Sequence, residues 1–338
     1  MAETTEIAWC DATWSPWEGC QKVGPGCDHC YAEARNKRFA AGANWGPGAP
    51  RRRTVDWSKP RLWNRAAGQA GRRMKVFPSL CDPFDNAVPV EWRLAFFQLI
   101  AATPHLDWLL LTKRIGNVAG MLGDWKTVPL LPNIWLGATV VTQAEADRDI
   151  PKLLAVPARV RFLSVEPMLE QMDITPFLWG KHAAVDLVCQ NCPRDADCEC
   201  GYHTREALKL PSLSWVICGG ESGPHARPMH PDWARSLRDQ CHAAGVPFTF
   251  KQWGCWRAAA WFDGPDADAD AGDDFVDLDR VGHVFLANDG RTWDTNGGRL
   301  MYPPLPLGHW CLMVNEGKKA AGRVLDGRTH DEFPEVPQ

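Results

Sequence analysis

Short apolar runs alternate with helix-forming segments along most of this chain, and this alternation limits the folds it can adopt. The runs are rich in β-branched and large side chains and occupy residues 74–80, 108–111, 134–138, 160–163, 215–218 and 248–250, with a weaker run at 7–10. Helical patterns fill residues 31–41, 89–102, 143–155 and 231–244. Repeated strand-then-helix order indicates a parallel sheet. Six or seven such units predict an α/β fold, a complete or partial parallel β/α barrel of the TIM type.

The chain is long enough for such a barrel and for additions to it. Its 338 residues are 45% hydrophobic, which suffices for a large core. We expect the barrel over residues 1–255, with an insertion at 179–212, and a C-terminal extension over 256–338 that contains an acidic loop at 263–279. No apolar run approaches the ~18 residues of a membrane span, and the first residues lack a signal-peptide pattern. We therefore expect a cytoplasmic protein without a membrane partner.

Three cysteines, Cys20, Cys27 and Cys30, follow the weak first run. The short gap between Cys27 and Cys30 brings two sulfurs to one metal centre, and the Gly-Pro-Gly bend at 24–26 allows Cys20 to return as a third ligand. Three thiolates can hold three corners of an iron-sulfur cube and leave the fourth iron open for chemistry, whereas a structural zinc site uses four protein ligands. In a reducing cytoplasm, clustered cysteines indicate metal or redox chemistry.

Zinc is the alternative metal for this triplet, because Cys10 or His29 could complete a four-ligand site. Buried free thiols are a further alternative, although such thiols seldom lie so close together in sequence. The residues alone therefore leave iron-sulfur, zinc and metal-free thiols open.

A second group of cysteines lies in the insertion, at Cys189, Cys192, Cys198 and Cys200. Four cysteines within twelve residues can surround one zinc ion tetrahedrally, and His203 could replace one of them. An accessory iron-sulfur cluster is the alternative. Because four ligands are available, the pattern indicates a closed, structural site.

Polar side chains come directly after each predicted strand. In β/α barrels the carboxyl ends of the strands build the active site, so a ring of such residues is typical of an enzyme. Each residue taken singly could instead end a strand or cap a helix. The residues are Ser79, Asp82, Thr112, Lys113, Arg114, Thr139, Ser164, Glu166, the segment 219–222 with Glu221, Lys251 and Gln252.

The segment 51–75 carries nine basic residues against one acid, Asp56, with Trp57 and Trp63 between them. Such a segment could neutralise phosphates while its indoles stack on bases, which would indicate a nucleic-acid substrate. A solvated connection before the first strong strand is the alternative interpretation.

Seven motifs together give the chain a resemblance to a known family. It resembles the phage-associated three-cysteine-motif proteins of unknown function, which are similar to radical S-adenosylmethionine enzymes and, among these, to spore photoproduct lyase. The motifs span nearly the whole chain: the cysteine segment 7–32, FPSLCDPF at 77–84, LTKR at 111–114, WLGAT at 135–139, SVEP at 164–167, GGESG at 219–223 and FKQWG at 250–254.

The resemblance implies that Cys20, Cys27 and Cys30 ligate a 4Fe-4S cluster whose open iron binds S-adenosylmethionine. An electron donor would then allow cleavage to a 5'-deoxyadenosyl radical that abstracts hydrogen from a substrate, and a three-cysteine-motif partner protein is expected. The implied cofactor contacts are Ser79 and Asp82 for the methionine amine, Thr139, Ser164 and Glu166 for the ribose or carboxylate, and His29 or Tyr31 for the adenine. The substrate candidates are Thr112, Lys113, Glu221 and Lys251.

Two features depart from the pattern of that superfamily. Its usual spacing is C-x3-C-x2-C with an aromatic residue before the last cysteine, whereas here the first gap has six residues and His29 stands at that position. The Gly-Gly-Glu segment also comes later in the chain than usual. The rival hypothesis is a non-catalytic zinc or iron-sulfur module that binds nucleic acid or a partner protein.

Overall fold

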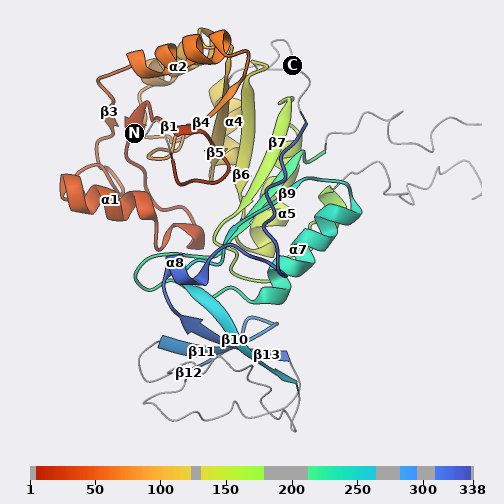
Figure 1. The fold of residues 1–338 in the computed structure, drawn as a ribbon. Helices are drawn as coiled ribbons and strands as arrows, with labels where there is room; N and C mark the ends of the chain where they lie inside the picture. Colours follow the sequence, from red (N-terminus) through yellow and green to blue (C-terminus); the bar gives the residue numbers. More distant parts are fainter. Residues whose placement is uncertain (1–4, 123–130, 179–211, 264–281, 295–308, 336–338) are drawn as a thin grey trace, which may run out of the picture.

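The computed structural model describes residues 5–122, 131–178, 212–263, 282–294 and 309–335. Its centre is a seven-stranded sheet in the order β1-β4-β5-β6-β7-β8-β9, in which every neighbouring pair is parallel (Figure 1). Because the strands follow one another across the sheet in chain order, the sheet curls in one direction, and the predicted partial β/α barrel is confirmed. The strands are β1 (Ala12–Thr13), β4 (Met74–Phe77), β5 (Leu106–Thr112), β6 (Ile134–Thr139), β7 (Val160–Val165), β8 (Trp215–Gly219) and β9 (Phe248–Gln252).

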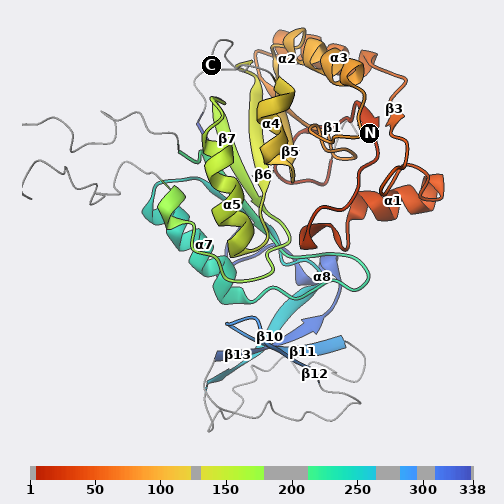
Figure 2. The same cartoon turned by 180° about the vertical axis from the view of Figure 1, so that it is seen from behind.

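Helices alternate with these strands, and α4, α5 and α7 lie against one face of the sheet (Figure 2). The four predicted helices are present, each with ends within one residue of the prediction. The helices α2 and α4 were not among the predicted segments. The helices are α1 (Tyr31–Ala40), α2 (Ser58–Gln69), α3 (Val90–Ala101), α4 (Ile115–Leu122), α5 (Gln143–Leu154) and α7 (Pro231–Ala243).

The strands are buried on both faces, which explains why they appear in the sequence as nearly continuous apolar runs. Successive side chains alternate between two cores: Leu136 packs toward the helices, whereas Trp135 joins an inner cluster with Phe162 and Trp215. Gly137 is required in this inner core, because a Cβ there would lie 2.4 Å from the Phe162 ring. The inner cluster fills the barrel and leaves its carboxyl-end mouth for the site.

The prediction of a first strand at residues 7–10 is wrong. The first strand is β1, Ala12–Thr13, and it pairs with β4. The earlier residues instead form a turn in which the Cys10 amide donates to the Ile7 carbonyl, at 3.2 Å. Trp9 points into the inner core and contacts Phe77, with ring centroids 4.5 Å apart. The run at 7–10 is therefore apolar because Trp9 fills part of the inner core, and not because these residues form a strand.

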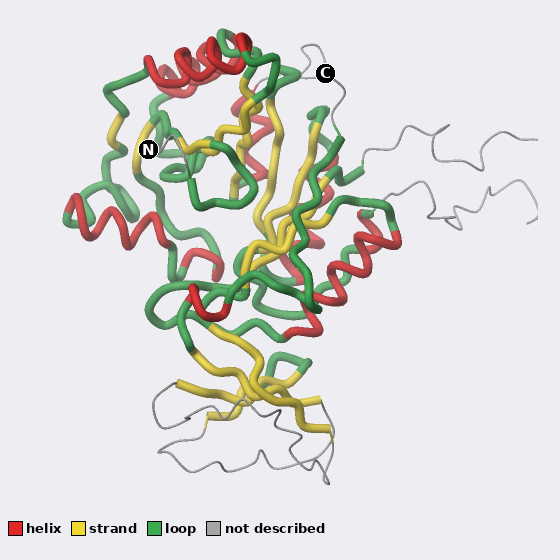
Figure 3. The backbone as a smooth tube through the Cα atoms, viewed as in Figure 1, coloured by secondary structure: helices red, strands yellow, loops and turns green. Residues whose placement is uncertain are grey.

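The C-terminal part forms an antiparallel sheet beside the carboxyl ends of the barrel strands, in the order β10-β13-β11-β12 (Figure 3). After α8 (Lys318–Ala321) the chain returns to the barrel, where the Phe250 amide donates to the His330 carbonyl at 2.9 Å. Residues 322–335 therefore cover the β9 edge of the sheet. The four strands are β10 (Trp256–Asp263), β11 (Gly282–Ala287), β12 (Thr292–Asp294) and β13 (His309–Asn315).

Two predicted features lie outside the described residues: the insertion with Cys189, Cys192, Cys198 and Cys200, and the acidic loop beyond Asp263. Within the parts of the chain that the structure does describe, no helix has the length and apolar character needed to cross a membrane.

Candidate active site at the mouth of the half-barrel

The three N-terminal cysteines meet at one cavity. After β1 the chain continues beside β4, where the Gly19 amide donates to the Leu80 carbonyl at 3.1 Å. A short 3-10 helix, η1 (Pro25–Cys27), follows, and Cys30 is the N-cap of α1. Cys20, Cys27 and Cys30 all line a cavity of about 140 Å³ at the carboxyl ends of β4 and β5. The structure thus brings the predicted triplet together at the predicted mouth.

The spacing of the three sulfurs does not suit a single ion. Four thiolates around zinc at ~2.3 Å would lie about 3.8 Å apart. The sulfurs of Cys20, Cys27 and Cys30 do not all lie within 4.8 Å of one another, and neither Cys10 nor His29 completes such a group with them. A cluster spreads its thiolates over different iron atoms, so its ligands lie farther apart than those of one ion.

Arg114 holds the first cysteine of the triplet. Its Nη1 lies 3.4 Å from Cys20 Sγ and 2.9 Å from Asp82 Oδ2, and its Nη2 donates to the Gln21 carbonyl at 2.9 Å. Burial and the Asp82 charge raise the pKa of Cys20 to about 11, while the Arg114 charge opposes them. Arg114 therefore anchors the cysteine loop to the end of β5, a role that its place next to Lys113 in the sequence did not reveal.

Asp82 and Thr112 support Arg114 rather than face the cavity freely. Thr112 Oγ1 donates to Asp82 Oδ1 at 2.7 Å, and the Lys113 amide donates to Oδ2 at 3.2 Å. Asp82, Thr112 and Arg114 are all buried. The carboxylate expected to meet a methionine amine is thus already saturated by the protein, because burial of a charge requires such partners. Ser79, which lines the same cavity, accepts the Tyr31 hydroxyl at its carbonyl at 2.6 Å.

A second clamp holds the other end of the cysteine loop. Glu221 accepts two bonds from the Arg227 guanidinium, at 2.6 and 2.9 Å, and lies 2.9 Å from His29 Nδ1. Arg227 also donates to the Pro25 carbonyl at 2.9 Å and pairs with Asp28 at 3.3 Å. Although burial opposes it, the hydrogen bonds from Arg227 and His29 lower the pKa of Glu221. Glu221 and His29, expected to contact substrate and adenine, therefore also join the loop to β8.

Two glycines allow these close approaches. A Cβ at Gly26 would lie 2.8 Å from Val141 Cγ1, so the loop can rest against the end of β6 only because residue 26 has no side chain. A Cβ at Gly220 would lie 1.9 Å from the Trp253 carbonyl oxygen. The Gly-Gly-Glu segment thus packs backbone against backbone on the loop after β9, which is the structural reason for its glycines.

A larger cavity of about 550 Å³ adjoins the cysteine cavity, and both are lined by Gly26, Cys30, Tyr31 and Lys113. Its size is typical of a small-molecule site. Much of its polar lining comes from the ends of successive strands, as the sequence predicts: Lys113, Thr139, Ser164, Glu166, Glu221, Ser222, Lys251 and Gln252. The other polar residues of the lining are Thr5, Glu6, His29, Tyr31 and Lys318.

Glu166 and Lys251 form an ion pair within this cavity. Lys251 Nζ lies 2.9 Å from Glu166 Oε1, and the Ser164 hydroxyl lies 3.2 Å from Oε2. The two side chains come from β7 and β9 and meet across β8, where a Cβ at Gly219 would lie 2.7 Å from Glu166 Oε1. A bound molecule could exchange hydrogen bonds with this pair without the protein having to bury a free charge.

Part of the basic segment 51–75 serves the fold. Arg51 pairs with Asp85 at 2.7 Å, with both side chains buried, and Arg73 pairs with Asp107 at 2.7 Å. Trp63 is buried on α2, and the Arg53 guanidinium lies over the Trp57 ring at 5.0 Å. The two indoles are therefore engaged within the protein. The segment contains the helix α2, and five of its basic residues, Arg52, Arg53, Arg61, Arg65 and Arg72, remain exposed.

A comparison with protein families shows to which family the chain belongs. The model of one family, described as "Protein of unknown function (DUF5131)", matches residues 4–334. The chain belongs to this family. It matches no curated protein significantly, and no solved structure either. The DUF5131 description names no activity, so the chemistry must be argued from the mouth of the half-barrel itself.

Proposed function

We propose that this protein is a radical S-adenosylmethionine enzyme with a 4Fe-4S cluster held by Cys20, Cys27 and Cys30. One observation carries the proposal: the three cysteines line a cavity at the barrel mouth that adjoins a larger cavity ringed by polar strand ends. A structural metal site would not need the second cavity. An enzyme needs it for the cofactor and the reacting part of the substrate.

The donor set fits the cluster. Three thiols face one cavity, their sulfurs do not all lie within 4.8 Å of one another, and Arg114 supplies a positive charge beside Cys20. When bound, such a cluster supplies the electron that cleaves S-adenosylmethionine to methionine and a 5'-deoxyadenosyl radical. An external electron donor must supply that electron.

The residues that line the two cavities would bind and orient the cofactor and the substrate. Thr139, Ser164 and Glu166 offer hydroxyl and carboxylate acceptors for ribose hydroxyls in the larger cavity, and Lys113 offers a cation for a carboxylate at the boundary of the two cavities. Asp82 acts through Arg114 as a positioning residue. We assign Lys251 to the substrate side, because its pairing with Glu166 keeps it in place until a substrate group replaces that contact.

The cavity also limits the substrate class. About 550 Å³ has to hold the ribose part of the cofactor together with the reacting group of the substrate. A nucleic-acid substrate would therefore present a single nucleotide to the mouth, as enzymes that act on bases require. The four-cysteine insertion lies outside the described residues. For this insertion we propose a structural zinc site, on the spacing of its cysteines alone.

Anaerobic reconstitution with iron and sulfide tests the proposal. We expect an absorption band at ~400 nm and an electron paramagnetic resonance signal that changes when S-adenosylmethionine is added. The unmutated chain should bind about four more iron atoms than the Cys27→Ala variant. Reduction with dithionite should then release 5'-deoxyadenosine. Zinc in place of iron at the triplet, with no cofactor cleavage, would sink the proposal and support the structural module.

Cys81 provides a matched control because it lines the same cavity and is not among the proposed ligands. The Cys81→Ser variant should keep the iron and the response to S-adenosylmethionine. If Cys81→Ser loses the cluster as completely as Cys27→Ala does, the cluster has four protein ligands and no open iron.

A further inference from the structure

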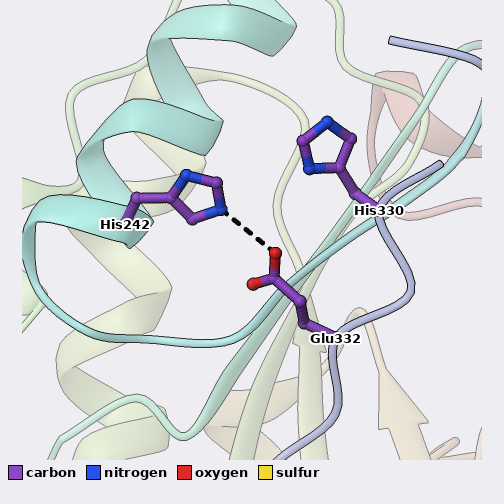
Figure 4. Close-up of side chains that lie close together, drawn as sticks. All are labelled: His242, His330 and Glu332. Atoms are coloured by element: carbon purple, nitrogen blue, oxygen red, sulfur yellow. Dashed lines mark hydrogen bonds and ion pairs between the residues drawn. The ribbon is translucent and has the colours of Figure 1, made fainter. Parts of the chain in front are cut away.

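Three side chains of types that bind metals, His242, His330 and Glu332, come together beside the start of β9, where Glu332 accepts the Phe248 amide (Figure 4). His242 is near the end of α7, and the other two residues belong to the segment 322–335 that covers β9. One ligand atom from each residue lies within 4.8 Å of the others, which within the described ranges is true of this group alone. The three side chains point toward one another.

His330 is prepared for a ligand. Its side chain is 2% exposed, and its Nδ1 is buried without a hydrogen-bond partner. In Figure 4 the ring nitrogen bonded to the attachment carbon, Nδ1, is on the side of Glu332 and His242. The other nitrogen, Nε2, lies 3.3 Å from the Leu325 carbonyl. Donation from Nε2–H to that carbonyl leaves a lone pair on Nδ1, which is the arrangement usual for metal-ligating histidines.

The spacing and anchoring also fit one ion. Zinc at 2.0–2.2 Å from nitrogen and oxygen ligands places neighbouring ligands about 3.3 Å apart. His242 Nε2 lies 3.2 Å from Glu332 Oε1, and the second carboxylate oxygen is fixed by the Phe248 amide at 3.0 Å. Because His242 and Glu332 are partly exposed, with side chains 35% and 40% accessible, the fourth position faces solvent.

We propose that His242, His330 and Glu332 bind a zinc-like divalent cation that fastens the C-terminal segment to the barrel. The Glu332 carbonyl already accepts the Thr249 hydroxyl at 2.8 Å, so the ion would add a link from α7 to a segment that lies along β9. Two imidazoles, one carboxylate and an open position form a donor set that suits zinc and related first-row metals. The site does not depend on the proposed function of the cysteine mouth.

Cadmium-113 nuclear magnetic resonance on the full chain tests this site separately from the cysteines, because thiolate-bound cadmium resonates far downfield of cadmium bound by nitrogen and oxygen. We expect one upfield resonance that grows once the cysteines are occupied, saturates at one further equivalent of cadmium and disappears in His242→Ala. Glu332→Gln should weaken cadmium binding at this site by at least about 100-fold, since even outer-shell partners contribute 10–100-fold.

The control is His105→Ala, which removes an exposed histidine outside the cluster and should leave the resonance unchanged. Circular dichroism establishes that each variant is folded. Absence of an upfield resonance in the unmutated chain, or its persistence in His242→Ala, would overturn the proposal. The downfield resonances report only on the cysteines, so the outcome at the histidine cluster is read separately from iron reconstitution at the mouth.

Discussion

The cysteine mouth and the histidine cluster differ in what prepares them for a metal. At the mouth, the sulfurs are spread beyond the spacing of one ion, and two clamps built on Arg114 and Arg227 hold the loop that carries them. At the histidine cluster, the ligand atoms already lie within 4.8 Å of one another, and bonds from Phe248 and Thr249 hold Glu332 against β9. The contacts at the mouth thus surround a cavity, whereas the side chains of the histidine cluster already touch one another and a bound ion would strengthen that contact.

Mutation of Arg114, which holds the cysteine loop at the mouth, should have the largest effect on stability. Arg114→Leu leaves the Asp82 carboxylate buried without its cation, which we expect to lower the free energy of unfolding by about 3–5 kcal/mol. Urea denaturation of the metal-free protein measures this loss. Arg114→Lys keeps a charge but lacks the planar fork that reaches Cys20, Asp82 and Gln21. It should therefore remain folded and take up less iron.

An unchanged urea midpoint in Arg114→Leu, or full iron uptake in Arg114→Lys, would contradict the role given to this clamp. The first result would mean that Asp82 is not held by Arg114 in solution. The second would mean that the loop carrying Cys20 needs only a charge beside it.

The second clamp predicts a dependence on pH. Because Arg227 and His29 lower the folded-state pKa of Glu221, its carboxylate contributes stability above its ordinary pKa of ~4.3, and this stability is lost as the pH falls through the lower folded value. Glu221→Gln should lower the free energy of unfolding by about 1–2 kcal/mol at neutral pH. The difference from the unmutated chain should shrink below pH ~4. Thermal unfolding across pH 3–7 measures both, and a constant difference would refute the assignment.

The histidine cluster should give the smallest effect without metal. The His242–Glu332 contact is exposed, so His242→Ala should change the free energy of unfolding by less than about 1 kcal/mol in the presence of a chelator. Added zinc should raise the melting temperature of the unmutated chain more than that of His242→Ala. Equal shifts in both proteins would show that zinc acts elsewhere, and the comparison between the two regions would lose its basis.

Much of the fold follows from local patterns. Runs such as residues 134–138 are apolar on both faces, and the residue directly after each run lies at the mouth because parallel strands end on one side. The cysteine loop could equally be found in the sequence, since its three cysteines lie within eleven residues. These features depend on neighbours in the chain, and the sequence contains them directly.

Other features depend on partners that only the fold brings together. Asp82 looks like a free carboxylate in the sequence, yet its cation, Arg114, comes from the next strand end. Arg227 meets Pro25 across 202 residues, and His242 meets Glu332 across 90. Trp9 resembles part of a strand, but the inner core holds it as a plug. Spacing and periodicity carry no information about such encounters.

The cover over β9 has a consequence for how this protein forms during synthesis. All seven barrel strands precede residues 322–335 in the chain, so a ribosome completes the sheet while its last edge still lacks a cover. An uncovered edge can pair with a strand of another nascent chain. Between synthesis of β9 and docking of His330 and Glu332, the growing polypeptide is therefore exposed to mispairing at this edge, and docking of residues 322–335 ends that exposure.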